Sequence, residues 1–187
     1  FDSRRLNSAN QTVFFAIRTA NNDGHKYINE LYDKGVRIFV CTIRPEKLQN
    51  GAYYLLVEDS LKALQHLGAY ARKSFSGNVI AIGGSNGKTI VKEWSRVLIA
   101  QDKKVCISPR SYNSQIGVAV SLWQLNENFE AGIFEAGISE PNEMQSLHDM
   151  ILPDTGLITN IGEAHGANFS SIEEKLKLMK EYNLAGV

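Results

Sequence analysis

The stretch Gly84-Ser85-Asn86-Gly87-Lys88-Thr89 carries residue types that can hold a phosphate group. Glycines let backbone N–H groups approach phosphate oxygens without an intervening side chain. Lys88 can neutralise charge on the β- and γ-phosphates, and the Thr89 hydroxyl can bind Mg²⁺. The usual P-loop, G-x-x-x-x-G-K-[ST], needs glycine at position 82, where this chain has Ile82, so the loop follows G-x-x-G-K-T instead. An apolar run before it and an amphipathic run after it favour a nucleotide site over a plain glycine turn.

Two further side chains follow apolar runs of the kind that form buried strands. Glu135 ends one such run, and His165 comes shortly after another. In a parallel sheet both would lie at the carboxyl edge of the strands, where ligands bind. A carboxylate there can bind Mg²⁺, although a solvated strand end is the alternative. For His165, the residues alone support a metal or substrate role and a surface or packing role equally well.

Three other positions are ambiguous from the residues alone. Lys180 lies in a run rich in Lys and Glu, which indicates a solvated helix face. Asn113 can cap the helix expected from Gln115 or contact a substrate, and the residues favour the cap. Ser3 and Arg4 belong to a polar turn with no chemistry of its own.

Strands and helices alternate from residue 79 onward, which predicts an α/β fold with a doubly wound, mostly parallel sheet. Ligands should then lie just after residues 82, 108, 136 and 161. Before residue 76 we expect a smaller α/β domain, with residues 74–78 as the linker. The expected strands cover 13–17, 36–41, 53–57, 79–82, 104–107, 132–136 and 155–161, and the later helices 89–100, 115–125, 142–150 and 171–182. On the helix over 89–100, Ile90, Trp94, Val97 and Leu98 share one face.

Composition excludes several classes of function. Twenty basic and twenty acidic residues cancel, which argues against a general binder of nucleic acid or of an anionic membrane. No apolar stretch reaches the length of a membrane span, and the first residues do not show the pattern expected of a signal peptide. Cys41 and Cys106 match no metal or redox spacing, so we expect two reduced thiols in the core of a cytoplasmic protein.

Several stretches together resemble the Mur ligase superfamily of peptidoglycan synthesis, whose variant of the P-loop is G-x-x-G-K-T. The resemblance covers nearly the whole chain in the right order. It is strongest to the type that adds D-alanyl-D-alanine to UDP-N-acetylmuramoyl-tripeptide, and residues 134–139 resemble a subgroup fused to an alanine racemase. Besides the loop, it rests on Lys92-Glu93, Tyr112-Asn113, Ile116-Gly117, residues 134–138 and 158–162, Ala164-His165 with Phe169, and residues 2–4, 14–16 and 23–25.

The resemblance implies an ATP-dependent amide-bond ligase that works through an acyl phosphate, with ATP and Mg²⁺ as cofactors. Lys88 would hold the β- and γ-phosphates, and Thr89 and Glu135 would bind one Mg²⁺. His165 would serve a second metal. A lysine on the helix after this histidine is often carbamylated in the superfamily, and Lys180 is the candidate.

The resemblance also implies how the chain is organised. Residues 1–76 would form the domain that binds the UDP-sugar, with Ser3 and Arg4 near the UDP. Residues 77–187 would form an incomplete central ATP-binding domain, in which Asn113 matches a position that orders substrate and loop. Because a carboxyl-terminal ligase domain is absent from this stretch, we expect the fragment alone to be inactive, and the protein to be a monomer.

The chain departs from the pattern of the superfamily at Gly83, Ile90, Ser114, Ala119 and Asn142. The first two lie at the edges of the loop, so phosphate binding should survive. Three alternatives stay open. They are another Mur-type ligase, of the tripeptide or folylpolyglutamate type, a nucleotide-binding module without catalysis, and a module that binds UDP-sugar beside a vestigial P-loop.

Overall fold

The computed structural model describes residues 8–137 and 141–162. Backbone contacts divide the chain into two units, Phe1–Leu64 and Gln65–Val187, and the division falls within helix α2 (Ser60–Ser74). Asp59 caps this helix by accepting hydrogen bonds from the Leu61 and Lys62 N–H groups at 2.8 and 3.1 Å. The sequence pattern puts the boundary after residue 76 instead. Ser74 is the last residue of α2, Asn78 is the first residue of the next strand, and residues 75–77 connect them, with Phe75 buried.

The first unit is built on a three-stranded parallel sheet in the order β1-β4-β5. Its strands are β1 (Val13–Phe15), β4 (Ile38–Cys41) and β5 (Tyr53–Leu56), and α1 (Ile28–Asp33) precedes β4. The unit also contains a short hairpin, β2 (Arg18–Thr19) with β3 (Asn22–Asp23), and the 3₁₀ turns η1 (Ala9–Gln11) and η2 (Gly24–Tyr27). The core comprises Ala16, Ile28, Leu31, Val36, Phe39 and Cys41.

A polar cluster fixes the turn at the start of η2. Asp23 accepts hydrogen bonds from the His25 N–H at 3.0 Å, from the His25 ring at 2.6 Å and from Arg18 Nε at 2.9 Å. The His25 backbone bond, followed by the His25 ring and the Arg18 guanidinium, lowers the pKa of Asp23 well below its usual range. His25 Nε2 in turn accepts the Thr42 N–H at 3.1 Å, so the cluster links η2 to the residue after β4.

This cluster predicts a pH dependence. Because the pKa of Asp23 is lower in the folded state, its stabilisation is present above the ordinary carboxyl pKa and is lost as the pH falls below about 4. We expect the unfolding free energy of Asp23→Asn to fall less steeply from pH 5 to pH 3 than that of the wild type, measured by urea titration. Asp33→Asn, at an exposed position, is the control. Equal slopes for Asp23→Asn and the wild type would contradict the prediction.

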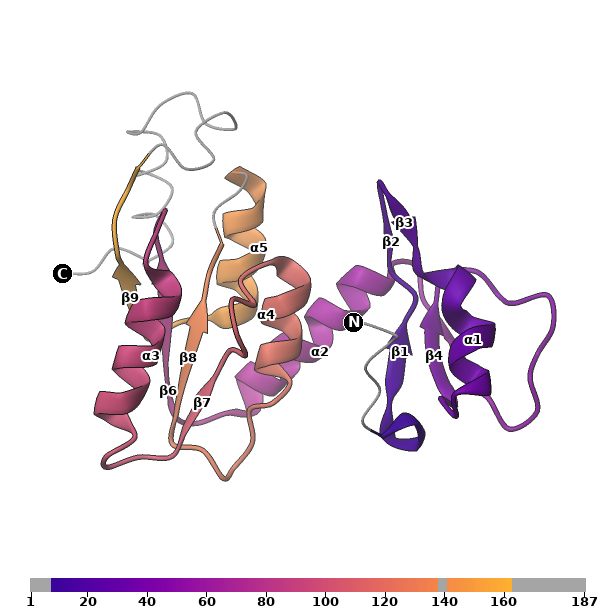
Figure 1. Cartoon of the computed structure of the whole chain (residues 1–187), viewed down its shortest axis with the longest axis horizontal. Helices are drawn as coiled ribbons and strands as arrows, with labels where there is room; N and C mark the ends of the chain where they lie inside the picture. The colour runs from indigo at the N-terminus through magenta and orange to yellow at the C-terminus, as the bar shows by residue number, and fades with distance from the viewer. Residues whose placement is uncertain (1–7, 138–140, 163–187) are drawn as a thin grey trace. The chain divides into compact units, whose positions relative to one another are not determined.

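The second unit has a four-stranded parallel sheet in the order β7-β8-β6-β9. The strands are β6 (Asn78–Gly83), β7 (Val105–Ile107), β8 (Ala131–Glu135) and β9 (Thr155–Ile158). Helices α3 (Lys88–Ile99), α4 (Gln115–Leu122) and α5 (Pro141–Ile151) connect them, which confirms the predicted alternation as far as β9. The helix expected over 171–182 lies outside the described residues. In Figure 1, α3 lies on one side of this sheet, and α4 and α5 lie on the other.

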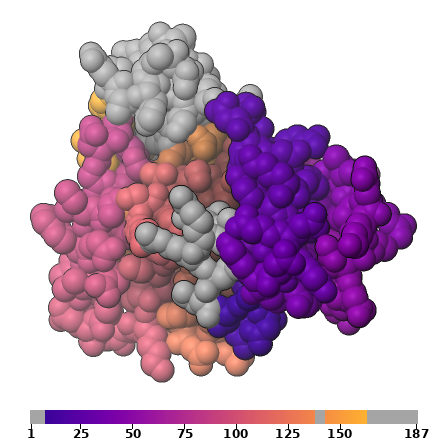
Figure 2. Space-filling view, turned by 45° about the vertical axis from the view of Figure 1, so that its right-hand side comes forward, coloured from indigo at the N-terminus to yellow at the C-terminus, as the bar shows by residue number. Residues whose placement is uncertain are grey.

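The apolar stripe of α3 does not face the sheet. Ile90, Trp94, Val97 and Leu98 share one face as predicted, but all four are exposed, and Trp94 keeps 69% of its surface. In Figure 2 the rose-coloured surface of this part of the chain, on the left of the view, is not covered by other parts of the molecule. The fully buried residue of α3 is Lys92. The side of the helix that meets the sheet therefore carries a charge instead of the apolar stripe.

Both cysteines are buried free thiols within the described residues, as the sequence predicts for Cys41 and Cys106. Burial raises the pKa of the Cys106 thiol to about 11. No helix in the described ranges is both long enough and apolar enough to cross a bilayer.

Candidate nucleotide-binding site

The predicted phosphate loop connects a buried strand to an exposed helix start. Val79, Ala81 and Ile82 of β6 are buried, and the loop leaves the sheet at its carboxyl edge. Gly84 and Gly87 have φ values of 129° and 79°, in the region that favours glycine. Helix α3 begins at Lys88 directly after Gly87. N–H groups in the first turn of a helix have no acceptor within the helix, so this start offers donors to an anion.

The segment that follows β9 holds the loop in place. Asn160 accepts the Ser85 N–H through its carbonyl at 2.9 Å and the Asn86 N–H through its side chain at 2.9 Å. Thr159 Oγ1 donates to the Asn86 carbonyl at 2.5 Å. Ser85 Oγ accepts from the Gly162 N–H at 2.9 Å. The loop conformation therefore depends on a segment more than seventy residues later.

This close approach predicts a large effect of one methyl group. A Cβ atom at Gly84 would come 2.1 Å from Thr159 Oγ1 and 3.0 Å from the Asn160 carbonyl oxygen, at a φ that side chains rarely adopt. We expect Gly84→Ala to cost about 2–3 kcal/mol of stability in thermal unfolding, from steric overlap together with backbone strain. It should also weaken nucleotide binding. Gly51→Ala, at φ 69° with no atom within 4 Å, is the control for strain alone, and an equal loss there would contradict the steric account.

The loop borders a pocket at the carboxyl edge of the sheet. The pocket has a volume of about 280 Å³, and its walls come from the loop and α3, from the residues after β7, and from the end of β8. Lys88 Nζ donates to the Gly84 carbonyl at 2.6 Å, so its ammonium lies against the loop. The lining residues are Gly87, Lys88, Thr89, Ile90, Ser111, Asn113 and Glu135.

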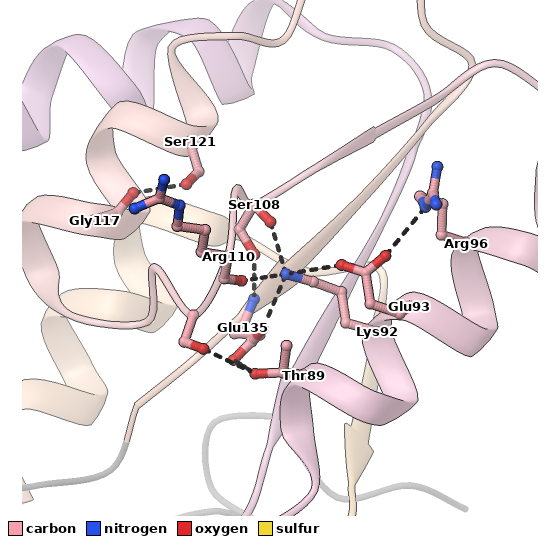
Figure 3. Close-up of polar contacts among 10 residues, drawn as sticks. Thr89, Lys92, Glu93, Arg96, Ser108, Arg110, Gly117, Ser121 and Glu135 are labelled. Carbon is pink, nitrogen blue, oxygen red and sulfur yellow. Dashed lines mark hydrogen bonds and ion pairs between the residues drawn. The ribbon is translucent and has the colours of Figure 1, made fainter. Parts of the chain in front are cut away.

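Glu135 brings a buried carboxylate to this pocket. It is the last residue of β8 and pairs in register with Ile82 of β6, beside the loop. Its Oε2 accepts a hydrogen bond from Thr89 Oγ1 at 3.0 Å, and Thr89 Oγ1 also lies 3.2 Å from Ser111 Oγ. Its Oε1 lies 3.0 Å from Lys92 Nζ, in a geometry short of a directed hydrogen bond. Figure 3 shows Thr89 and Lys92 of α3 converging on Glu135 at the end of β8.

The donor atoms at this point fit one Mg²⁺ ion. Mg²⁺ prefers hard oxygen ligands and takes few of them from the protein, with phosphates and water supplying the rest. The Glu135 carboxylate and the Thr89 hydroxyl, both hard oxygen donors, lie in hydrogen-bond contact at the pocket wall. Within the described residues no group of three or more His, Cys, Asp or Glu side chains could hold a metal ion.

Asn113 lines the pocket and is not the helix cap. Ser114 caps α4, since its hydroxyl accepts the Gly117 N–H at 3.3 Å. The preference of the residues alone for Asn113 as the cap is therefore wrong, because the chain places the capping hydroxyl one residue later. The Asn113 carbonyl instead accepts the Gly137 N–H at 2.8 Å, which ties the residues after β7 to those after β8.

The structure brings Lys88, Thr89, Glu135 and Asn113 to one pocket, with Gly87 in its wall. Gly84, Ser85 and Asn86 form the rest of the loop. Four predicted site residues lie outside the described residues, namely Ser3, Arg4, His165 and Lys180.

Sequence reasoning gave no role to three residues that the structure connects to this site. Lys92 contacts Glu135, Asn160 holds the loop, and Ser111 lies beside Thr89. Helical spacing could have found Lys92, because it lies four residues after Lys88 and three after Thr89 and so shares their side of α3. No comparable signal marks Asn160, whose contact with the loop depends on the pairing of β6 with β9.

Comparison with known proteins decides the family. The model of the Mur ligase middle domain matches residues 82–184, more than half of the chain. This chain belongs to the Mur ligase family. The matched residues include the phosphate loop, Glu135 and the segment after β9 that holds the loop.

Curated relatives within the Mur ligase family are named UDP-N-acetylmuramoyl-tripeptide--D-alanyl-D-alanine ligase. The protein from Treponema pallidum is 33% identical over 97% of this chain and 42% of its own length. The protein from Synechocystis is 35% identical over 95% of this chain and 40% of its own length. This chain thus spans about two fifths of the length of these Mur ligases.

Solved structures of Mur ligases share the fold. The MurF structure from Acinetobacter baumannii superposes with a TM-score of 0.87 at 26% identity, over 97% of this chain and 39% of that chain. The MurF ligase from Thermotoga maritima, solved in complex with ADP, gives a TM-score of 0.77 at 26% identity over 94% of this chain and 42% of that chain. These matches confirm the predicted α/β architecture and the Mur ligase resemblance.

Proposed function

We propose that the full-length protein to which this chain belongs is an ATP-dependent ligase that joins D-alanyl-D-alanine to UDP-N-acetylmuramoyl-tripeptide. The observation that carries the proposal is the pocket in which Lys88, Thr89 and the buried Glu135 carboxylate meet, in a chain whose curated relatives bear this name. The ADP bound in the Thermotoga maritima neighbour supports a nucleotide in this chain as well.

The proposed chemistry has two steps. A terminal carboxylate oxygen of the tripeptide attacks the γ-phosphorus of ATP, the bond from that phosphorus to the β-γ bridging oxygen breaks, and ADP leaves. The amine nitrogen of D-alanyl-D-alanine then attacks the carbonyl carbon of the acyl phosphate. The amide bond forms, inorganic phosphate leaves, and the nitrogen gives up a proton.

The residues of this chain would act mainly by positioning and by balancing charge, which is what phosphoryl transfer demands of a protein. Lys88 Nζ, at the loop carbonyls, would turn to the β- and γ-phosphates. N–H groups at the start of α3 would donate to the same oxygens. Mg²⁺ bound beside Thr89 and Glu135 would screen the charge of these phosphates.

The remaining assignments belong to the same proposal. Ser3 and Arg4 would contact the UDP group within an amino-terminal substrate domain over residues 1–76. His165 and Lys180 would serve a second metal in the ATP-binding domain over 77–187. Asn113 would order the substrate, which its place in the pocket wall supports. That the protein is a cytoplasmic monomer stays a prediction from the sequence.

Phosphate release by the full-length protein tests the proposal. The assay contains Mg·ATP, UDP-N-acetylmuramoyl-tripeptide and D-alanyl-D-alanine, and each is omitted in turn. Release that needs all three components is the expected result. Nucleotide binding without release that depends on both substrates would overturn the ligase and would favour a nucleotide-binding module. Release that accepts another amine in place of the dipeptide would identify another Mur-type ligase.

A further inference from the structure

Lys92 is a fully buried lysine on the side of α3 that faces the sheet. Its ammonium lies 2.7 Å from the Ser108 carbonyl oxygen and 3.0 Å from Glu135 Oε1, and it also donates to the Arg110 carbonyl oxygen. The ammonium thus has two carbonyl acceptors and one close carboxylate, surroundings that suit a compact ammonium. A fourth oxygen, Oε1 of the half-exposed Glu93, lies farther away at 3.5 Å.

These acceptors come from separate elements of the site. Ser108 and Arg110 belong to the turn after β7, which leads to Ser111 and Asn113 in the pocket wall. Glu135 ends β8. Figure 3 shows the ammonium between these groups, one turn of helix from Thr89. One buried charge therefore joins α3 to the two strand ends that form the pocket.

The two oxygens of Glu135 have different partners. Oε1 faces Lys92, and Oε2 accepts from Thr89, whose hydroxyl lies at the pocket. We infer that Lys92 is a positioning residue that balances the charge of Glu135 and fixes its rotation, so that Oε2 is presented with the Thr89 hydroxyl to a divalent cation. This inference rests on the proposed function, because it names what prepares the metal side of the same pocket.

The contacts of Lys92 also keep its ammonium apart from the phosphate loop and outside the pocket wall. Among the contacts described for its ammonium are backbone carbonyls and carboxylates, and none of them belongs to the phosphate loop at 84–87. Lys92 does not line the pocket. Loss of its charge should therefore weaken the metal-dependent part of nucleotide binding and leave binding without metal nearly unchanged.

Titration of the full-length protein with a fluorescent ADP analogue, with and without Mg²⁺, tests the inference. We expect Lys92→Met to raise the Mg²⁺ concentration for half-maximal binding by about tenfold or more, while affinity without Mg²⁺ changes by less than about twofold. Mn²⁺ binding followed by electron paramagnetic resonance should weaken in parallel. Lys92→Arg, which keeps the charge, should recover part of the loss.

A double variant decides whether Lys92 acts through Glu135. If it does, Lys92→Met should add less than about twofold to the Mg²⁺ requirement of Glu135→Gln, because positioning needs the partner. Additive effects, or an equal loss of binding with and without Mg²⁺, would overturn the inference. Should Lys92→Met fail to fold, the double variant removes both charges and allows the same comparison with Glu135→Gln.

The wild-type control separates this inference from the proposed function. A wild-type protein that binds no nucleotide, with or without Mg²⁺, would refute the proposed function and the role of Lys92 together. A wild type that binds nucleotide in a Mg²⁺-dependent way, beside a Lys92→Met variant with an unchanged Mg²⁺ requirement, would refute the role of Lys92 alone.

Discussion

Lys88→Met should lower the rate of phosphate release by the full-length protein by a factor of about 10²–10³, and should weaken ATP binding as well. The Lys88 ammonium already lies against the loop, 2.6 Å from the Gly84 carbonyl oxygen, at the pocket that would receive the phosphates. Methionine preserves much of the length of the side chain but removes the positive charge and its donors. Calorimetric titration with ATP and a steady-state assay of phosphate release measure the two effects.

Lys103→Met is the matched control for Lys88→Met. Lys103 is an exposed lysine in the turn after α3 and is not part of the pocket wall. It should leave ATP affinity and phosphate release within about twofold of the wild type, since surface charges away from a site contribute little. Equal ATP affinity in Lys88→Met and wild type would show that the loop does not use this lysine to bind phosphate.

Glu135→Gln should nearly abolish phosphate release, with a loss of about 10³-fold, and should raise the Mg²⁺ requirement of nucleotide binding. The amide can still accept from the Thr89 hydroxyl, but it carries no charge for a cation. The change also leaves the buried Lys92 ammonium without its nearest carboxylate. We therefore expect a fall of about 2–4 kcal/mol in the free energy of unfolding, measured by denaturant titration.

Glu93→Gln is the corresponding control. Glu93 also faces the Lys92 ammonium, at 3.5 Å, but its side chain is half-exposed and lies outside the pocket wall. It should change stability by less than about 1 kcal/mol, as solvent-exposed ion pairs do, and it should leave the Mg²⁺ requirement unchanged. If Glu93→Gln and Glu135→Gln shifted the Mg²⁺ requirement equally, the assignment of Glu135 as the carboxylate that binds Mg²⁺ would be refuted.

The sequence predicts the order of strands and helices well because alternating apolar runs and glycine turns are local signals. The loop, the strand before it and the helix after it all lie where the motif places them, and helix α3 begins one residue earlier than expected. Glu135 could be assigned to the pocket because the carboxyl ends of parallel strands share one edge. Lys88, Thr89 and Glu135 were thus predictable from motif and topology.

Features that depend on contacts distant in sequence were not predictable from the residues. The apolar spacing of α3 identifies a stripe, but the sheet meets the side with Lys92 and leaves Trp94 exposed. The buried Lys92 ammonium takes its acceptors from two other strand ends. No local sequence pattern predicts these contacts. The hydrogen bonds of Asn160 to the loop likewise form because β9 pairs with β6 and so brings Asn160 beside it.

Transfer of ¹⁸O tests most directly whether this pocket activates a carboxylate with ATP. The full-length protein is given Mg·ATP, D-alanyl-D-alanine and UDP-N-acetylmuramoyl-tripeptide that carries ¹⁸O in its terminal carboxylate. Because the attacking carboxylate oxygen stays with phosphorus when the amide forms, each released phosphate should contain one ¹⁸O atom. Lys88→Met and Glu135→Gln should lower the rate at which labelled phosphate appears by the factors given above for each variant. Release of phosphate without ¹⁸O would mean that water, and not the carboxylate, attacks ATP, and would contradict the proposed ligase.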